Sequence, residues 1–451
     1  MKKKLLILIN SDLFVRNYIY TNSFKYLIKK FDCYFIGSKN DILNKKKFRF
    51  KISNNKFLGF IDYSKNKISK FEKFIYKNFL INKNKSNTIS HIISNRNRLK
   101  LIWQGDSFAK IFYMFLPRFF SFLIKNLNYI YLKIFKINNF NFSVNPKLKK
   151  IFYKLKPDLV IFPMQGSHIL SYEILKLSKK NTFALIDNWD NLSSRGTHDI
   201  KPNYISVWGQ QTKIHAIKYQ NFKKNRIFLN GTPRFENYFA LRNKKIKKNF
   251  KFKYILFLES FGNHNNEKIL NKLDKLINQS TFLKNYKIVY RPHPWQIKNL
   301  SKINIEKFSN ILIDPQILKN YLLDKNSTKF QPDINYYPSL IKNAELVVTG
   351  PTSMVIESTI FYKKTLLLGF SDKKCSYQDE LMNYVHLEKL EKLNNIEVCK
   401  NLNYIEDDIY KLIKKRINKN IVDKQRSFYL FNSKIGYSKN LKLIIDKILY
   451  D

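Results

Sequence analysis

Apolar and polar positions change period several times between residues 333 and 369. Four apolar side chains recur at helical spacing over residues 336–344, and residues 346–348 form an apolar run typical of parallel strands buried on both faces. A second helical pattern over residues 354–361 and a further strand pattern follow. This stretch therefore predicts a helix, a buried strand, a tight turn, a second helix and a second strand.

The same alternation of strand-length apolar runs and helical patterns covers most of the chain. It predicts strands at residues 5–10, 33–36, 158–162, 182–186, 204–207, 226–229, 254–258 and 286–290, and helices at residues 169–177 and 437–450. Alternating strands and helices are typical of α/β folds with parallel sheets. At 451 residues the chain is too long for one ordinary core, so we expect two Rossmann-like domains.

Two stretches interrupt this alternation. The pattern is lost over residues 62–146, which we interpret as a helical insertion in the first domain. Residues 242–253 are rich in Lys and carry no apolar pattern, so we place the interdomain linker there. The first domain is thus expected at residues 1–241 and the second at residues 254–420, followed by C-terminal helices at residues 421–451.

The turn that follows the predicted strand at residues 346–348 has the composition of a phosphate-binding turn. Gly350 allows close approach of a ligand to the backbone, and Pro351 is followed by Thr352 and Ser353, which are both good helix N-caps. Glu357 lies about one turn into the next helix, within reach of a ribose. The alternative interpretation is an ordinary helix cap followed by a solvated Glu.

A second motif follows the predicted strand at residues 286–290. Here the chain continues as Arg291, Pro292, His293 and Pro294, so a His lies on a turn stiffened by two prolines. Its alternative role is that of a turn residue bonded to its own backbone. Because both motifs follow strands, we expect them at the same carboxyl edge of one sheet.

In the first domain, a polar loop follows the predicted strand at residues 182–186. Residues 187–196 combine carboxylates, amides, hydroxyls, a Trp and a Gly, a mixture that suits the binding of a sugar better than a simple connection. Asp187 and Asp190 are its carboxylates. His168 belongs to another edge loop, at residues 165–168.

Together these motifs resemble the nucleotide-binding half of GT-B glycosyltransferases. The resembling residues are Arg291-Pro292-His293-Pro294, Asp333 with Leu340 and Ala344, and the Val-Val-Thr-Gly-Pro-Thr-Ser run with Glu357. The resemblance is strongest over residues 255–369. It is closest to the branch of CDP-glycerol glycerophosphotransferase-like and surface-polysaccharide enzymes, in which a Trp-Asp-Asn-Leu run similar to residues 189–192 also occurs.

The resemblance implies two Rossmann-like domains facing a cleft, with the C-terminal helices crossing back to the first domain. It implies an enzyme that moves a glycosyl or glycerophosphoryl group from a nucleotide-activated donor, which we expect to be UDP- or CDP-linked. The acceptor would be a surface polysaccharide or a lipid-linked glycan.

The resemblance also implies roles for individual residues. Arg291, His293 and the turn at residues 350–353 would bind the nucleotide and stabilise the leaving diphosphate. Asp187 or Asp190 is the candidate base for the acceptor hydroxyl, with His168 as a rival. Neither a metal ion nor another cofactor is implied.

The charge of the chain favours anionic partners but not nucleic acid. The net charge is +50, yet Arg supplies only 12 of the 83 basic residues, and the Lys residues are spread along the whole chain. A nucleic-acid-binding protein more often concentrates Arg and Lys in a patch. We therefore expect attraction to anionic lipid headgroups and phosphorylated substrates instead.

One basic, aromatic stretch at residues 108–137 is a candidate for membrane contact. Lys and Arg interrupt it too often for a transmembrane helix, so it is either a helix lying in the membrane interface or an insertion packed on the domain. The three cysteines show no disulfide or zinc spacing, which indicates a reducing compartment. We expect a cytoplasmic protein peripheral to the inner face of the cell membrane.

Two other functions remain open. A UDP-sugar 2-epimerase would use the same fold with further acids and bases around the donor. A non-enzymatic, basic glycan- or lipid-binding protein would bind no nucleotide.

Overall fold

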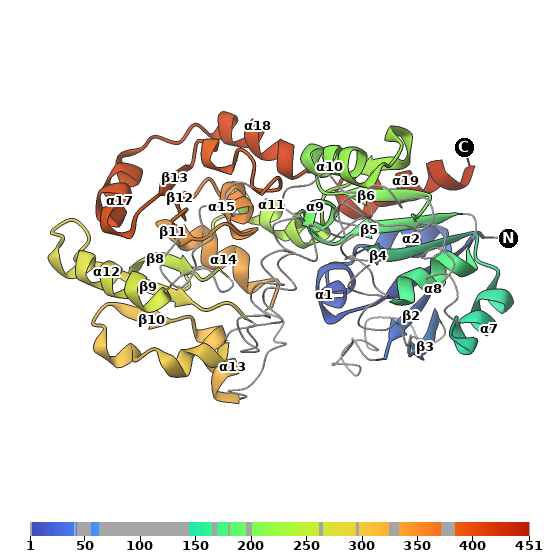
Figure 1. Cartoon of the computed structure of the whole chain (residues 1–451), viewed down its shortest axis with the longest axis horizontal. Helices are drawn as coiled ribbons and strands as arrows, with labels where there is room; N and C mark the ends of the chain where they lie inside the picture. The colour runs from blue at the N-terminus through green and yellow to red at the C-terminus, as the bar shows by residue number, and fades with distance from the viewer. Residues whose placement is uncertain are drawn as a thin grey trace, which may run out of the picture. The chain divides into compact units, whose positions relative to one another are not determined.

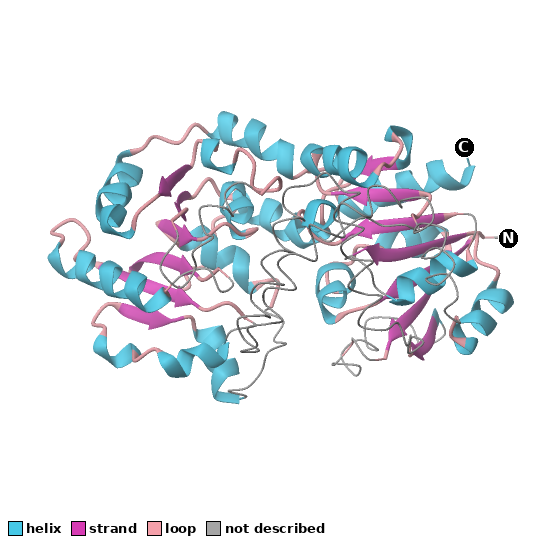
Figure 2. Ribbon diagram, in the orientation of Figure 1, coloured by secondary structure: helices cyan, strands magenta, loops and turns pink. Residues whose placement is uncertain are grey.

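The computed structural model describes residues 2–39, 42, 56–62, 144–164, 169–178, 181–194, 201–260, 265–294, 297–323, 333–370 and 384–450. The chain forms two compact units, one of residues 1–231 with 431–451 and the other of residues 232–430 (Figure 1). Each unit has one sheet of parallel strands accompanied by helices (Figure 2). The predicted α/β fold class is therefore confirmed.

The sheet of the first unit contains seven strands in the order β3-β2-β1-β4-β5-β6-β7. The strands are β1 (Lys4–Ile9), β2 (Asp32–Ser38), β3 (Phe57–Ile61), β4 (Leu159–Met164), β5 (Thr182–Ile186), β6 (Tyr204–Val207) and β7 (Ile227–Leu229). The helices are α1 (Asp12–Phe14), the π-helical turn η1 (Val15–Ile19), α2 (Lys25–Lys30), α7 (Pro146–Leu155), α8 (Ile169–Leu177), α9 (Asn191–Ser194), α10 (Gln210–Gln220), the 3₁₀ turn η3 (Lys224–Arg226) and α19 (Tyr437–Tyr450).

Both faces of this sheet are covered, as the apolar sequence of β1 requires. Leu5 and Ile7 share a core cluster with side chains of α2 and α19, whereas Leu6 and Leu8 share another with side chains of α7 and α8. Successive side chains of a strand point to opposite faces, so the two clusters are the two sides of one sheet.

The sheet of the second unit contains six strands in the order β10-β9-β8-β11-β12-β13. The strands are β8 (Lys253–Leu258), β9 (Tyr286–Arg291), β10 (Ile311–Ile313), β11 (Leu346–Thr349), β12 (Lys364–Leu368) and β13 (Ile396–Cys399). The α-helices are α11 (Glu236–Arg242), α12 (Asn266–Gln279), α13 (Pro315–Leu323), α14 (Tyr336–Asn343), α15 (Met354–Ile360), α17 (Ile405–Lys414) and α18 (Lys419–Tyr429). The 3₁₀ turns are η4 (Pro233–Phe235), η5 (Ile297–Lys302), η6 (Ile305–Lys307), η7 (Leu390–Lys392) and η8 (Leu402–Tyr404).

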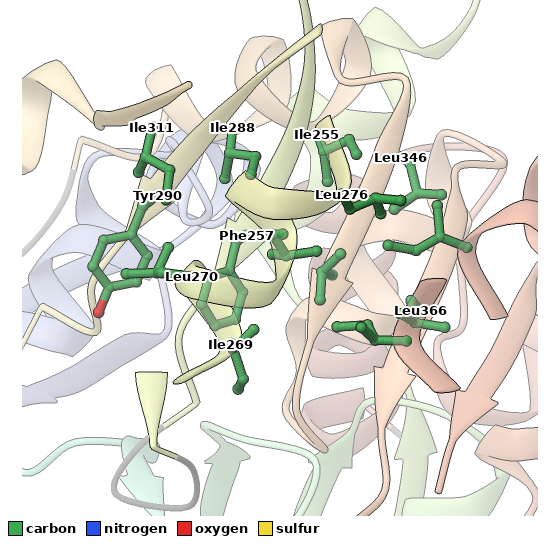
Figure 3. Close-up of a cluster of buried hydrophobic side chains, with 14 of the residues drawn as sticks. Ile255, Phe257, Ile269, Leu270, Leu276, Ile288, Tyr290, Ile311, Leu346 and Leu366 are labelled. Carbon is green, nitrogen blue, oxygen red and sulfur yellow. The ribbon is translucent and has the colours of Figure 1, made fainter. Parts of the chain in front are cut away.

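One face of this second sheet packs against α12 and α17. Figure 3 shows Ile269, Leu270 and Leu276 of α12 beside Phe257 of β8 and its neighbours. On the other side, the Tyr254 hydroxyl donates a hydrogen bond of 2.6 Å to the Leu340 carbonyl of α14. With helices on both faces, polar chemistry in this unit is confined to the ends of the strands.

The boundary between the units differs from the predicted one. The predicted first domain extended to residue 241, but the structure assigns Thr232 and the following residues to the second unit. The physical reason lies in α11, whose Tyr238 donates a hydrogen bond of 2.6 Å to Glu357 of α15. The stretch at residues 242–253 is likewise held on this unit, since the Asn343 amide donates to the Lys247 carbonyl at 2.9 Å.

The C-terminal helices divide between the two units. Helix α18 belongs to the second unit, where its Asp423 accepts hydrogen bonds from Arg242 and Tyr362. Helix α19 belongs to the first, where Ser438 accepts a hydrogen bond from the backbone N–H of Tyr26 in α2. The chain therefore returns to its first unit after residue 430.

The predicted insertion at residues 62–146 and the segment at residues 108–137 lie almost entirely outside the described residues. Among the described helices, none is both long enough and apolar enough to cross a membrane.

Candidate functional site

The strand order marks one position in each sheet where ligands bind in folds of this kind. In the second unit the chain leaves β8 toward β9 and β10, then resumes on the other side of β8 with β11. Open α/β sheets bind ligands at such a point, outside the carboxyl ends of the two strands. The loops after β8 and β11 flank it, and the loop after β9 is the next one along.

Two predicted motifs lie at this carboxyl edge. The turn of His293 follows β9, and the turn of Gly350 to Ser353 follows β11. Only β8 separates these strands, so their ends are about 10 Å apart at the usual strand spacing. The structure therefore brings the two motifs to one end of one sheet.

Glu259, directly after β8, connects the surrounding loops. Its Oε2 accepts hydrogen bonds from the Tyr290 hydroxyl at 3.1 Å and from the His293 backbone N–H at 2.9 Å. Its Oε1 accepts one from the Asn266 amide of α12 at 2.6 Å. Glu259 is 7 % exposed, and burial raises its pKa to about 7 against the opposing effect of its hydrogen bonds.

Sequence reasoning did not single out Glu259. The available signal was its position, since it is the first residue after the opening strand of the second unit.

The His293 side chain is partly buried at the sheet edge. Burial lowers the pKa of His293 to about 4, so its imidazole is neutral at pH 7. A neutral imidazole carries one N–H donor and no charge. If His293 contacts a phosphate, it does so as a hydrogen-bond donor.

Arg291, which we predicted to bind the nucleotide, has another set of partners. Its guanidinium is 2 % exposed and pairs with Asp314 at 2.6 Å. It also donates to Gln316 at 2.8 Å and stacks on Tyr337 with 4.1 Å between the guanidinium carbon and the ring centroid. This geometry favours a structural role, in which Arg291 holds the end of β9 to the loop after β10 and to α14.

The turn at residues 350–353 begins α15 differently from the predicted cap. The Thr352 hydroxyl accepts a hydrogen bond from the Met354 N–H at 3.3 Å, whereas the Ser353 side chain makes no cap bond to the backbone. Ser353 donates instead to Glu357 at 3.4 Å. Pro351, Thr352 and Ser353 are half-buried, so this turn remains accessible at the edge.

Glu357, predicted to bind a ribose, is bonded within the protein. Its Oε1 pairs with Arg234 at 3.1 Å, and its Oε2 accepts the Tyr238 hydroxyl at 2.6 Å. The side chain is 7 % exposed. These contacts hold α11 against α15, and a ribose would have to share the carboxylate with them.

In the first unit, the polar loop after β5 is short and firmly held. Asp187 is 1 % exposed at the end of the strand. Asp190 caps α9, because its Oδ2 accepts the Ser194 hydroxyl at 2.6 Å and its carbonyl accepts the Ser193 N–H at 3.0 Å. Its other oxygen, Oδ1, is buried and has no hydrogen-bond partner among the described residues.

Trp189 does not offer the open ring that sugar stacking requires. It is 3 % exposed, because this loop is drawn in against its neighbours. The Asn191 amide donates to the Met164 carbonyl at 3.3 Å, and Gln220 of α10 donates to the Leu192 carbonyl at 2.8 Å. The aromatic part of the predicted sugar site is therefore a core side chain.

Other predicted site residues of this unit cannot be placed. His168, together with Arg195 and Gly196 of the polar loop, lies outside the described residues. Within the part of the chain that the structure describes, no group of three His, Cys, Asp or Glu side chains could hold a metal ion.

The buried ion pair between Arg291 and Asp314 allows a test of whether Arg291 has a structural role. We expect Arg291→Ala to lower the free energy of unfolding by about 3–5 kcal/mol, because the buried Asp314 would lose its counter-ion. Arg416→Ala, which removes an exposed Arg from the same unit, should change it by less than about 0.5 kcal/mol. Urea denaturation followed by circular dichroism measures both. Equal stability of the two variants would show that Arg291 is not a structural residue.

The pKa values of Glu259 and His293 predict opposite effects of pH on stability. Glu259 holds its proton more tightly when folded, so its contribution is complete below pH 4.5 and is lost as the pH rises to about 7. His293 resists protonation when folded, so its contribution is complete above pH 6.5 and is lost as the pH falls to about 4. Each amounts to about 3 kcal/mol, and the two nearly cancel between pH 4.5 and 6.5.

Removing one of these two groups should reveal the pH dependence of stability that the other contributes. Relative to the wild type, Glu259→Gln should lose stability on acidification across that interval, and His293→Gln should lose it as the pH rises. The slopes should approach about 1.4 kcal/mol per pH unit, with opposite signs. Denaturant titrations at several pH values measure them. If stability changes with pH in both variants as it does in the wild type, the pKa shifts assigned to Glu259 and His293 are both wrong.

Comparison with known proteins extends these observations. No protein-family model and no curated protein sequence matches the chain. Its structure is similar to the UDP-GlcNAc 2-epimerase from Methanocaldococcus jannaschii, with a TM-score of 0.50, 14 % identity, and coverage of 98 % of this chain and 99 % of the other. It is also similar to the UDP-GlcNAc 2-epimerase from Neisseria meningitidis, solved with UDP-GlcNAc bound, with a TM-score of 0.51, 10 % identity and coverage of 99 % and 100 %.

A third similar structure is that of MnaA from S. aureus with UDP, with a TM-score of 0.50, 11 % identity, and coverage of 100 % of this chain and 96 % of the other. At such low identity the similarity establishes the fold alone. The chain has the two-domain α/β fold of these proteins, which is GT-B-like.

Proposed function

We propose that this protein is an enzyme that binds a nucleotide diphosphate-linked sugar at the carboxyl edge of its second sheet. The observation that carries the proposal is the placement of two turns, that of His293 and that of Gly350 to Ser353, on either side of the end of β8. A neutral His and a turn of small residues offer hydrogen-bond donors to a diphosphate. The UDP and UDP-GlcNAc present in similar structures support this choice of ligand.

Two reactions fit such a site. Transfer of a glycosyl or glycerophosphoryl group is favoured by the motifs that resemble glycosyltransferases, and Asp190, whose Oδ1 has no hydrogen-bond partner among the described residues, is then the candidate base. Epimerisation of a UDP-sugar at C2 is favoured by the similar structures, which are UDP-GlcNAc 2-epimerases. Of the two, epimerisation has the more direct structural support, because the similar structures named above include UDP-GlcNAc 2-epimerases.

One pair of assays separates these reactions. An epimerase converts UDP-GlcNAc without any acceptor, and proton NMR would detect the inverted centre at C2. A transferase releases its nucleotide only when an acceptor glycan is present. If UDP, CDP and UDP-GlcNAc all fail to raise the thermal midpoint, the non-enzymatic alternative is favoured, because a ligand at 100 times its Kd adds about 2.7 kcal/mol of stability.

Variants of the proposed residues should separate binding from catalysis. His293→Ala should lower turnover by about 10²- to 10³-fold, as the loss of one preorganised donor does. Asp190→Asn should lower turnover by about 10²- to 10⁴-fold and leave nucleotide affinity within a factor of about two, as expected for a general base.

Asp158→Asn is the matched control for Asp190. It removes a carboxylate before β4, at the amino end of the same sheet, where Asp158 binds Lys3 and the Lys4 backbone. Calorimetry and turnover assays should show wild-type activity for this variant. Wild-type turnover in both His293→Ala and Asp190→Asn would place the active site elsewhere.

We also propose that the protein works at the cytoplasmic face of the cell membrane on a surface glycan or lipid-linked acceptor. This rests on the charge of +50 and on the composition of residues 108–137. Replacing Phe119, Phe120 and Phe122 with Ser should release the protein from vesicles containing anionic lipid. Phe282→Ser, at a side chain 58 % exposed in the second unit, should not. Retention of the triple variant at the same salt concentration would contradict the membrane role of this segment.

A further inference from the structure

The turn that carries His293 has an unusual backbone. Pro292 and Pro294 have no N–H group, so His293 supplies the only backbone donor of these three residues. That donor is bonded to Glu259 Oε2 at 2.9 Å. This hydrogen bond ties the backbone of a turn stiffened by two prolines to the Glu259 carboxylate.

Glu259 is itself held from several elements. The Tyr290 hydroxyl of β9 and the Asn266 amide at the start of α12 both donate to its carboxylate. Its own N–H donates to the Arg291 carbonyl at 3.0 Å, which joins the ends of β8 and β9. The carboxylate thus has one geometry, and the His293 backbone is tied to it.

We infer that Glu259 is a positioning residue for the nucleotide site, which fixes the His293 turn at the carboxyl edge of the sheet through the carboxylate bond to the His293 N–H. The identity of the ligand in this inference rests on the proposed function, whereas the hydrogen bond between Glu259 and the His293 backbone does not. Glu259 would not touch the ligand.

The strength of the hydrogen bond between the His293 N–H and Glu259 depends on whether the Glu259 carboxyl group is ionised. The groups bonded to its carboxylate are the Tyr290 phenol, the Asn266 amide and the His293 backbone N–H, and no cation pairs with it among the described residues. On α12 the nearest acid along the chain, Glu267, pairs with Lys307 instead. Hydrogen bonds to an ionised carboxylate are roughly twice as strong as those to a neutral acceptor. The His293 turn should therefore be held most firmly above pH 7.

The first arm of the test uses the protein without ligand. The chain has seven His residues, so selective ¹⁵N-His labelling yields seven backbone amide signals, and the His293 signal is the one missing from His293→Gln. In the wild type this signal should shift with a midpoint near pH 7, because burial raises the pKa of Glu259 to about 7. In Glu259→Gln the shift should disappear.

Asp274→Asn is the matched control. Asp274 is a carboxylate of α12, 8 % exposed, and it also accepts a backbone N–H, that of Asn310 at 2.8 Å. Asn310 precedes β10, so this bond lies at the amino end of the same sheet. Asp274→Asn should keep the wild-type titration of the His293 signal.

The second arm measures binding of UDP-GlcNAc by calorimetry between pH 5.5 and 8.5. Its diphosphate is a diester and does not titrate in this range, so changes in affinity report on the protein. Affinity should rise through pH 7 in the wild type and in Asp274→Asn. In Glu259→Gln it should be about tenfold weaker at pH 8 and nearly independent of pH.

The two arms separate the possible failures. An unchanged His293 titration in Glu259→Gln overturns the positioning role, whatever binds. If the titration behaves as expected but UDP-GlcNAc and UDP do not bind the wild type, the proposed function is wrong and the link stands. If the wild type binds and Glu259→Gln retains its affinity and pH dependence, the positioning role in binding is wrong while the proposed function stands.

Discussion

Both sheets are apolar on their two faces, and this constraint determines where the protein can carry chemistry. Strands such as β1 and β8 have almost no exposed side chain, since helices cover each side. Polar groups can then be placed only beyond the strand ends. The strand orders leave one natural position for a ligand in each sheet, between β1 and β4 and between β8 and β11.

The carboxylates buried near the edge of the second sheet illustrate how such polar groups are accommodated. Asp314 is neutralised by Arg291, and Glu357 by Arg234. Glu259 has three hydrogen-bond donors but no cation among the described residues. Burial without a compensating charge brings the pKa of Glu259 to about 7, so Glu259 is suited to exchange a proton at neutral pH.

The same reasoning changes the chemistry assigned to His293. A charged imidazole would attract a diphosphate directly, but burial lowers the pKa of His293 to about 4. The site would then bind a diphosphate with directed hydrogen bonds, which depend on geometry more steeply than a point charge does. Precise placement of the His293 turn accordingly matters more, and Glu259 is the group that supplies it.

The amino-acid pattern alone predicts the class of the fold and the sheet edge at which the His293 and Gly350 turns lie. The bounds of α8, β5, β6 and α19 follow from local apolar periods, which depend only on neighbouring residues. The strands β3, β10 and β13 escaped prediction, and they are edge strands of three to five residues with partly exposed side chains.

Only the tertiary structure decided what the site residues do. Arg291 and Glu357 lie at the predicted edge, yet their partners come from other elements, and those of Glu357 are 123 and 119 residues away. The position of the boundary between the units depends on the same contacts. The local sequence of a charged residue near the end of a strand is the same whether the residue binds a ligand or a buried counter-ion. The counter-ion comes from a distant part of the chain, so only the tertiary structure reveals it.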